Sequence, residues 1–441
     1  MKWVFFLTIV LMSPVLAGLL RTSKQYLAPT AFLIGAAMFT IVPSLWAAPI
    51  PWPGWPGYVH GIEVSFLDSI SLAIIIATRP VHTSRFIVLA FAALCVAFGL
   101  STTVAYQTMP ALFYGWQLFR AALLFVAIAR LCAADPRAPV ALIGGLGIGL
   151  LYEAYLATFQ YIHGAARPGG NLTHANFLGL ASDFVVFPAL ALMLGGRHFF
   201  RWAIVFAAGL VIAVVGGSRA TLGLFAVGTM LTIFLSIRHH RTSRKMAFGA
   251  IAALLVVASV PVMIWAANRR TEAEKISSDA ERTSMKLAAW MMVTDHPLGI
   301  GANSYVVVAN VGGYSQRAGV AWNPENRSAP VHNTYYLVLA EMGFFGLFAF
   351  SATFAAIILL GLRTLRKHIP GDAGELVPGL VATMIIAAIH ISFEYVFMNF
   401  IPHYLFAISA GTLVALAARA NVAVKGTPAL KPSLAVPSPA I

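Results

Sequence analysis

The feature that most constrains this chain is the recurrence of long apolar runs along almost its whole length. A helix needs about 20 mostly apolar residues to cross the roughly 30 Å hydrocarbon core of a bilayer, whereas a barrel strand needs only about 10. Because backbone groups inside the bilayer must satisfy their own hydrogen bonds, runs of this length are predicted to be helices. Only 10% of the residues are charged, compared with roughly a quarter in soluble domains. The sequence therefore predicts an all-α polytopic membrane protein.

Thirteen apolar segments are expected, from which we predict about twelve transmembrane helices. They lie near 2–20, 27–47, 58–78, 85–106, 111–133, 138–160, 174–195, 199–216, 220–237, 246–266, 332–362, 374–398 and 400–418. The first segment has two interpretations, because Lys2, a short apolar run and "SPVLA" are also typical of a signal peptide. The topology of residues 1–26 therefore stays open. The predicted parts are an N-terminal bundle (1–266), a large loop (267–331), C-terminal helices (332–420) and a proline-rich tail (421–441).

The connections fall into two groups by charge. The net charge is +14 (29 basic minus 15 acidic residues), and the basic residues gather in every second connection. These residues are Arg79, Arg85, Arg130, Arg137, Arg197, Arg201, Arg238, Arg241, Arg244, Lys245, Arg363, Arg366 and Lys367. Because Lys and Arg gather in cytoplasmic loops, the other connections and the long loop are predicted to face outside. The charges are spread over separate loops, so the expected partner is the bilayer and not a nucleic acid.

The predicted outer loop, 267–331, is long and rich in charge, with seven basic and six acidic residues. Loops longer than about 15 residues are usually functional or disordered. The stretch "ERTSMKLAAWMMV" is typical of a helix, with Met285, Leu287, Trp290 and Val293 roughly on one stripe. We therefore expect a partly helical cap over an outer cavity, with a passive external loop as the alternative.

Two candidate residues stand at predicted outer helix ends. Arg219 follows a Gly-Gly turn in "VVGGSRATLGLF", where its guanidinium can bind a phosphate bidentately or snorkel to lipid headgroups. His332 opens "VHNTYYLVLAEMGFFGLF", and its imidazole can exchange a proton near neutral pH. Asn333 beside it is suited to orienting either the imidazole or a substrate hydroxyl. A structural histidine is the alternative.

Other polar groups suggest two further sites. Arg167, His174 and Asn176 form an outer patch where a helix enters the membrane. Asp68, Glu153, Asp183, His390 and Glu394 are expected inside the bilayer, where such groups usually pair or face a cavity. Asp183, His390 and Glu394 also allow a proton relay in a transporter, although the chain lacks the strong internal repeat typical of transporters. No phosphate-binding glycine loop and no Cys/His cluster is present, so no cofactor and no metal are predicted.

Three stretches, taken in order, resemble the superfamily of O-antigen ligases, O-antigen polymerases and bacterial O-oligosaccharyltransferases. They are "GGSRATL", "ERTSMKLAAWMMVTDHPLGIGANSY" and "HNTYYLVLAEMGFFGL". The family's outer loop carries an arginine, a helical stretch, a Pro-x-Gly-x-Gly motif and a His-Asn pair that opens a helix. The matching positions here are Arg282, then Pro297, Gly299 and Gly301, then His332 and Asn333. Lys286 stands where the family often has tryptophan, which leaves Arg269 and Arg270 as alternatives to Arg282.

The resemblance implies a fold similar to GT-C-like glycosyltransferases and a metal-independent reaction. In that reaction a glycan moves from undecaprenyl pyrophosphate to an acceptor hydroxyl, which for a ligase belongs to lipid A–core, on the periplasmic face of the inner membrane. Polymerase and protein O-oligosaccharyltransferase activities are the alternatives. His332 is the expected base, with Glu325 in reserve, and Arg219 and Arg282 are expected to stabilise the leaving pyrophosphate. The expected substrate-binding residues are Asn333, Arg167, His174, Asn176 and Arg270.

Overall fold

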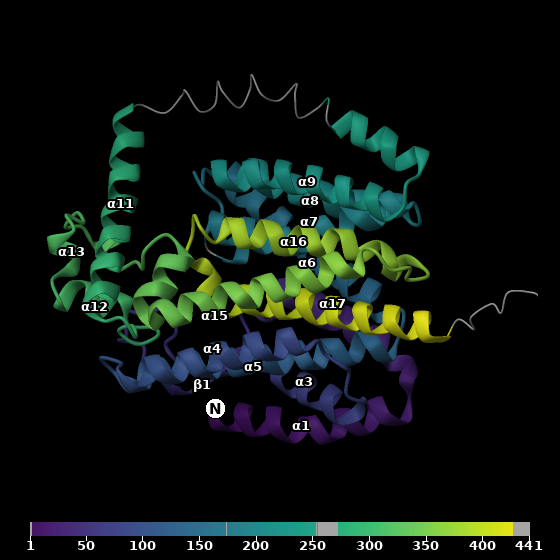
Figure 1. The fold of residues 1–441 in the computed structure, drawn as a ribbon, viewed down its shortest axis with the longest axis horizontal. Coiled ribbons are helices and arrows are strands. Elements are labelled where there is room, and N and C mark those ends of the chain that lie inside the picture. Colours follow the sequence, from purple (N-terminus) through teal and green to yellow (C-terminus); the bar gives the residue numbers. More distant parts are fainter. Residues whose placement is uncertain (1, 173, 253, 255–271, 427–441) are drawn as a thin grey trace, which may run out of the picture.

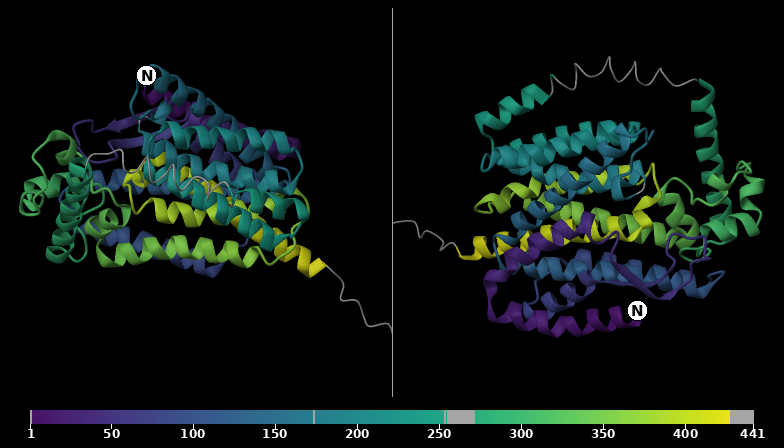
Figure 2. Two further views of the ribbon diagram at one scale, coloured as in Figure 1. Left: turned by 90° about the horizontal axis from the view of Figure 1, so that it is seen from above. Right: turned by 180° about the vertical axis from the view of Figure 1, so that it is seen from behind.

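The computed structural model describes residues 2–172, 174–252, 254 and 272–426, and it is a bundle of long, roughly parallel helices (Figures 1 and 2). Nine helices within these residues are long and apolar enough to cross a membrane, which supports a multi-pass membrane protein. They are α1 (Lys2–Thr22), α4 (Arg85–Thr103), α5 (Thr108–Ala134), α6 (Ala138–Ile162), α7 (Ala175–Gly195), α9 (Arg219–His239), α15 (Thr334–Thr364), α16 (Asp372–His390) and α17 (Phe400–Gly426). Shorter apolar helices are α2 (Leu27–Thr40), α3 (Phe66–Ala77) and α8 (Phe199–Val215).

The expectation of helix over 27–47 and 58–78 is wrong in part. Helix α2 ends at Thr40, and β1 (Trp46–Pro51) pairs antiparallel with β2 (Gly61–Ser65), with Ile50 opposite Ile62. Five prolines between residues 43 and 56 explain the change, because proline lacks the N–H donor that a helix interior needs. Most of the predicted segment 246–266 lies outside the described residues. Its described beginning belongs to a helix over 243–252.

The first segment forms α1, which packs along α3. The Ser13 and Ser69 hydroxyls lie 3.1 Å apart, and the Arg21 guanidinium donates to the Ile76 carbonyl oxygen at 2.7 Å. The short 3₁₀ helix η1 (Lys24–Tyr26) then leads into α2. Residues 2–26 are thus an ordered part of the bundle, and their topology stays a prediction.

The two groups of connections lie at opposite ends of the bundle. One end, called here the loop end, holds the long loop with α11 (Glu272–Asp295), α12 (Tyr305–Val311), α13 (Tyr314–Arg317) and α14 (Pro324–Arg327) (Figure 1). There the Trp55 indole donates to the Asn303 carbonyl oxygen at 2.8 Å. At the other end, called the basic end, Lys245 pairs with Glu375 at 2.7 Å. The sorting of connections by charge is therefore confirmed as a sorting in space.

A break in α15 receives the Pro-x-Gly-x-Gly segment of the loop. Gly343 has φ 68° and ψ −172° inside α15, so the carbonyl groups before it are released from the helix. The Ile300 N–H donates to the Ala340 oxygen at 3.1 Å, and the Gly301 N–H to the Glu341 oxygen at 3.0 Å. Gly299 has φ +92°, and a Cβ at this position would lie 2.3 Å from the Glu341 oxygen. The glycines of the motif therefore permit a close approach to the helix that bulkier residues would prevent.

Helix α11 packs against α15 with a face that differs from the predicted stripe. Its buried residues are Met285, Ala288, Ala289, Met292 and Val293, whereas Leu287 and Trp290 are 45% and 49% exposed. At 3.6 residues per turn, positions 287 and 290 fall on the side of the helix opposite to 285, 288 and 292. The helical character of the loop is confirmed. The prediction that Leu287 and Trp290 share one stripe with Met285 and Val293 is wrong.

Two buried polar groups fasten the loop to the bundle. The Asn303 side chain accepts from the Val59 N–H at 3.1 Å and donates to the Val59 oxygen at 2.8 Å. The Glu341 carboxylate accepts from the Tyr58 hydroxyl at 2.5 Å and from the Ser304 N–H at 2.9 Å. Because buried polar groups are costly when unpaired, these bonds fix where the loop lies.

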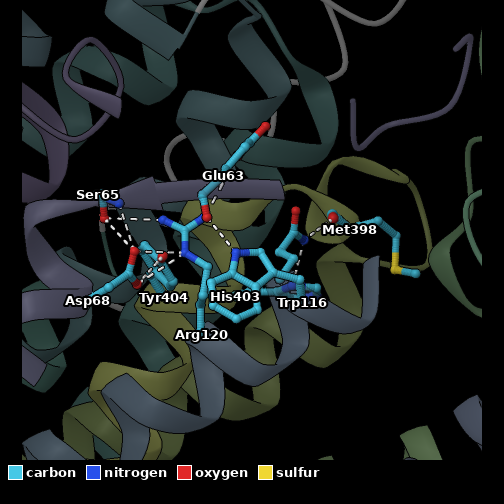
Figure 3. A network of polar contacts seen from close by, with 9 residues as sticks. Glu63, Ser65, Asp68, Trp116, Arg120, Met398, His403 and Tyr404 are labelled. Carbon is cyan, nitrogen blue, oxygen red and sulfur yellow. Dashed lines mark hydrogen bonds and ion pairs between the residues drawn. The ribbon is translucent and has the colours of Figure 1, made fainter. Parts of the chain in front are cut away.

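A buried ion network at the start of α3 joins β2, α3, α5 and α17 (Figure 3). Arg120, with a side chain 2% exposed, contacts Asp68 at 3.0 Å and Glu63 at 3.8 Å. Asp68 also closes a capping box with Ser65 and accepts from the Tyr404 hydroxyl at 3.3 Å. Asp68 is therefore a paired residue in the first turn of α3, and its contacts are structural.

We expect Gly299→Ala to loosen the loop, because alanine would combine an unfavourable positive φ with a clash against the Glu341 backbone. The matched control is Gly313→Ala, where φ is +72° and nothing lies within 4 Å of the added Cβ. Melting temperature and the rate of loop proteolysis in detergent measure the effect. Gly299→Ala should show a lower melting temperature and faster cleavage than Gly313→Ala. Equal behaviour of the two variants would contradict the close-approach explanation.

Candidate active site at the loop end of the bundle

The centre of the candidate site is the Glu394 carboxylate, in the connection between α16 and α17. Its side chain is only 3% exposed, and Oε2 lies 3.3 Å from Nδ1 of His332. Oε1 lies 3.6 Å from a guanidinium nitrogen of Arg282 and accepts a hydrogen bond from the Asn176 side-chain amide. Residues from α7, α11 and the start of α15 thus converge on one buried carboxylate.

The backbone around His332 is held by its neighbours. Asn333 is the N-cap of α15, and its Oδ1 accepts from the Tyr336 N–H at 3.1 Å. The Asn333 amide also donates to the Ser392 oxygen at 2.6 Å. Thr334 donates through its hydroxyl to the Glu394 carbonyl oxygen at 2.7 Å. The described contacts of Asn333 therefore position the histidine and the glutamate, and its binding of substrate stays a prediction.

The His332 imidazole has the surroundings of an oriented general base. Its Nδ1 faces the Glu394 carboxylate, and the ring packs edge-on against Tyr395, with centroids 5.3 Å apart. When Nδ1–H donates a hydrogen bond to the Glu394 carboxylate, Nε2 keeps a free lone pair that can take a proton from a hydroxyl. The side chain is 28% exposed, so a reactant can reach it.

The predicted patch Arg167, His174 and Asn176 belongs to the same cluster. The Arg167 guanidinium donates to Asn176 Oδ1 at 2.8 Å, and the Asn176 N–H donates to His174 Nδ1 at 3.2 Å. Burial lowers the pKa of His174, Glu394 raises it, and Arg167 and His332 lower it further. His174 is therefore neutral at neutral pH, while Asn176 links the patch to Glu394.

Glu394 is ionised in this setting. Burial alone would raise the pKa of its carboxyl group, but His332, Arg282 and His174 together lower it below its ordinary value. This single anionic group contacts Arg282 directly and is linked to Arg167 through Asn176, so the cluster keeps excess positive charge. Such a site attracts an anionic ligand.

Arg219 follows a turn that packs next to this cluster. It is exposed at the first position of α9, directly after the turn at Gly216 and Gly217. A Cβ on Gly216 would lie 3.7 Å from the Ala175 side chain, and one on Gly217 would lie 4.0 Å from the Ala166 oxygen. The turn therefore borders the residues next to Asn176 and Arg167. Among the described residues, none forms a hydrogen bond or ion pair with the Arg219 guanidinium, and its binding of a ligand stays a prediction.

The remaining predicted residues have separate outcomes. Glu394 was expected inside the bilayer with Asp183 and His390, but helix α16 ends at His390 and leaves Glu394 in the connection at the loop end. Asp183 and His390 pair with each other at 2.8 Å, fully buried between α7 and α16. The reserve base Glu325 is exposed and has no described contact with His332. Arg270 and its neighbour Arg269 lie outside the described residues, so their roles stay predictions.

These features define a polytopic α-helical membrane protein with a histidine, glutamate and arginine site beneath a folded loop. Residues 202–351 match the O-antigen ligase family, a range that holds Arg219, Arg282 and His332. The match confirms the resemblance and supports assignment of the chain to the O-antigen ligase and polymerase family. No curated protein matches the chain. Glu394 and the Arg167 patch lie outside the matched range and join the site only through the fold.

We expect Glu394→Gln to lower the free energy of unfolding by roughly 1–3 kcal/mol at pH 7, because it removes a buried anion from charged partners. The folded-state pKa of Glu394 lies below its ordinary value of 4.5. The stabilisation is therefore complete above pH 4.5 and is lost as the pH falls through the folded-state pKa. The gap in melting temperature between parent and variant should narrow below pH 4.5. Glu325→Gln is the control, and a gap that is constant with pH would contradict the ionised state.

Proposed function

We propose that this protein transfers a glycan from undecaprenyl pyrophosphate to an acceptor hydroxyl at the loop end, on the periplasmic face of the bacterial inner membrane. The lipid A–core oligosaccharide is the proposed acceptor. The observation that carries the proposal is the pairing of His332 with Glu394 beside Arg282, with Arg167 and Arg219 close by. The family match supports activity of the ligase or polymerase type.

The proposed reaction is a single displacement at the anomeric carbon of the donor sugar. The acceptor oxygen forms a bond to this carbon while Nε2 of His332 takes the hydroxyl proton. The bond from the carbon to the pyrophosphate oxygen breaks, and the pyrophosphate leaves with the electron pair. Glu394 stabilises the imidazolium that forms, and the proton then passes to solvent. No nucleotide is needed because the donor is linked to a lipid.

Arginines suit the leaving group in this reaction. Negative charge grows on the bridging oxygen as the bond breaks, and guanidinium groups stabilise it with bidentate hydrogen bonds. The Arg282 side chain is 39% exposed and lies 3.6 Å from Glu394, so much of its fork is open to a ligand. Arg219 is exposed at a helix N-terminus, where backbone N–H groups add further donors for an anion.

An apolar cavity next to the site supports a lipid-linked donor. It encloses about 250 Å³ between α4, α5, α15 and α17. Phe397, three residues after Glu394, lines this cavity together with mostly apolar side chains. They include Phe91, Leu94, Phe98, Phe350, Phe354 and Phe406. We propose that the polyprenyl chain enters here while its pyrophosphate lies at the arginines.

The same site is compatible with a polymerase or a protein O-oligosaccharyltransferase, because these activities differ only in the acceptor. Deleting the gene and separating the lipopolysaccharide on a gel distinguishes them. Loss of all long chains with the core intact indicates a ligase, whereas survival of a band with one repeat unit indicates a polymerase.

The transporter alternative relied on a relay through Asp183, His390 and Glu394, and no described contact joins Glu394 to the other two.

We expect His332→Ala to abolish transfer, with a loss of roughly 10²–10⁴-fold or more, because the acceptor hydroxyl then has no positioned base. The assay uses purified protein with lipid-linked donor and acceptor. His163→Ala is the matched control, since this histidine is exposed at the loop end and its Nδ1 contacts only the Phe159 oxygen, within its own helix turn. Full activity of a folded His332→Ala variant would remove His332 from the mechanism.

We expect Arg219→Lys and Arg282→Lys each to reduce the transfer rate at least about tenfold, because an ammonium group cannot reproduce the guanidinium fork. Arg317→Lys is the control. Arg317 is also in the long loop and half exposed, and its ion pair at 3.6 Å is with Asp295. If both test variants keep the parent rate, charge alone suffices and the bidentate contact is wrong.

We expect transfer to continue in excess EDTA, because arginines supply the charge stabilisation that a divalent metal would otherwise give. Within the described part of the chain, no group of three or more His, Cys, Asp or Glu side chains is placed to hold a metal ion. The side chains of Glu272, Glu274 and Asp279 lie outside this description and are the alternative site. Activity that vanishes with EDTA and returns with magnesium or manganese would overturn the proposal.

A further inference from the structure

A second pocket lies at the basic end, far from the candidate active site along the helices. It encloses about 430 Å³ where α2, α6 and α17 meet the connection before α16. Its wall combines apolar side chains with three guanidinium groups. The lining residues that matter here are Phe32, Val140, Ala141, Arg137, Arg201 and Arg419.

The acidic groups around this pocket already have partners. Asp135 is bound by Arg137, whose guanidinium donates at 2.9 Å and 3.2 Å. Asp372, the acidic residue in the lining, pairs with Arg197 at 3.5 Å. Asp135 and Asp372 each form an ion pair with an arginine other than Arg201 and Arg419.

Among the described residues, neither Arg201 nor Arg419 forms a hydrogen bond or ion pair with a carboxylate. Asp135, which also attracts Arg419 electrostatically, is already paired with Arg137 at 2.9 Å. The Arg201 guanidinium lies over the Trp202 ring at 4.9 Å, and a Cβ on Gly144 would lie 2.4 Å from one of its nitrogens. It thus sits against α6 without an acceptor. One guanidinium nitrogen of Arg419 is buried and has no hydrogen-bond partner. Because an unpaired buried donor on a charged group is costly, the pocket is short of one anion.

The chain itself offers little to supply this anion. Residues 421–441, which follow Arg419 in sequence, contain Lys425 and Lys431 and no Asp or Glu. A phosphate group from outside the chain fits better, because guanidinium forks bind it bidentately. The N-terminus of α6, which begins at Ala138 beside the pocket, adds a favourable dipole.

We infer that this pocket binds the phosphate headgroup of an anionic phospholipid, with Arg201 and Arg419 as its ligands. The apolar side chains of Phe32, Val140 and Ala141 provide a surface for the start of an acyl chain, which inorganic phosphate would leave uncovered. Basic pockets between transmembrane helices on the cytoplasmic side are known to take such headgroups, and this end carries the connections predicted to be cytoplasmic. The site is separate from the proposed glycan transfer and does not depend on it.

The test is native mass spectrometry of the full chain titrated with phosphatidylglycerol and, separately, with phosphatidylcholine. The parent should bind phosphatidylglycerol preferentially, and the double variant Arg201→Gln/Arg419→Gln should bind it at least about tenfold more weakly. The matched control is Arg363→Gln, which removes an exposed arginine of the basic end outside this pocket. Equal binding by the double variant and the parent would overturn the assignment.

A second variant covers the case in which the double variant fails to fold. Ala141→Trp keeps every arginine and fills the pocket from its α6 wall, so it should lose the phosphatidylglycerol preference as well. Melting temperatures in inorganic phosphate distinguish the source of the anion. Stabilisation of the parent by phosphatidylglycerol and not by inorganic phosphate supports a lipid site. Equal stabilisation by both, or an unchanged lipid preference in Ala141→Trp, would contradict it.

Discussion

The site depends on the burial of one carboxylate, Glu394, at the end of the bundle where the long loop folds. Its own connection offers it no cation. Its contacts come from other elements instead: the Arg282 guanidinium, the His332 imidazole and a hydrogen bond from the Asn176 amide. A buried ion that loses a partner is strongly destabilising. The same contacts that stabilise the folded loop therefore bring the imidazole and the arginines together. Stability and the proposed chemistry share one interaction.

The loop reaches this carboxylate because α15 is broken at Gly343. The break releases the carbonyl groups of residues 340 and 341, which then accept from the backbone of the Pro-x-Gly-x-Gly segment. Glu341 uses its side chain to hold Tyr58 and the start of α12. These contacts set the position of α11 and hence of Arg282. The Pro-x-Gly-x-Gly segment thus joins the loop to the membrane helices.

Much of the site could be predicted because its residues stand at helix ends on one side of the membrane. Apolar run length and loop charge place Arg167, Asn176, Arg282 and His332 at that side without any knowledge of packing. The position of Glu394 was not predicted, because the apolar run 374–398 looks like one span. Only packing shows that α16 ends at His390 and leaves Glu394 in the connection. The hairpin β1–β2 was not predicted for a similar reason. Its residues are apolar enough to resemble a membrane helix, although five prolines disfavour a helix there. The buried face of α11 is set by its contacts with α15. Hydrophobicity alone did not show that Leu287 and Trp290 would be exposed.

The most direct test of this account is a reconstituted reaction with the purified protein alone. The donor is undecaprenyl pyrophosphate carrying a labelled glycan, the acceptor is lipid A–core, and both the labelled product and the released undecaprenyl pyrophosphate are measured. Label should appear on the acceptor, with one undecaprenyl pyrophosphate released for each glycan transferred. Label that stays on the carrier in the presence of acceptor, or that appears only as free glycan in water, would contradict it.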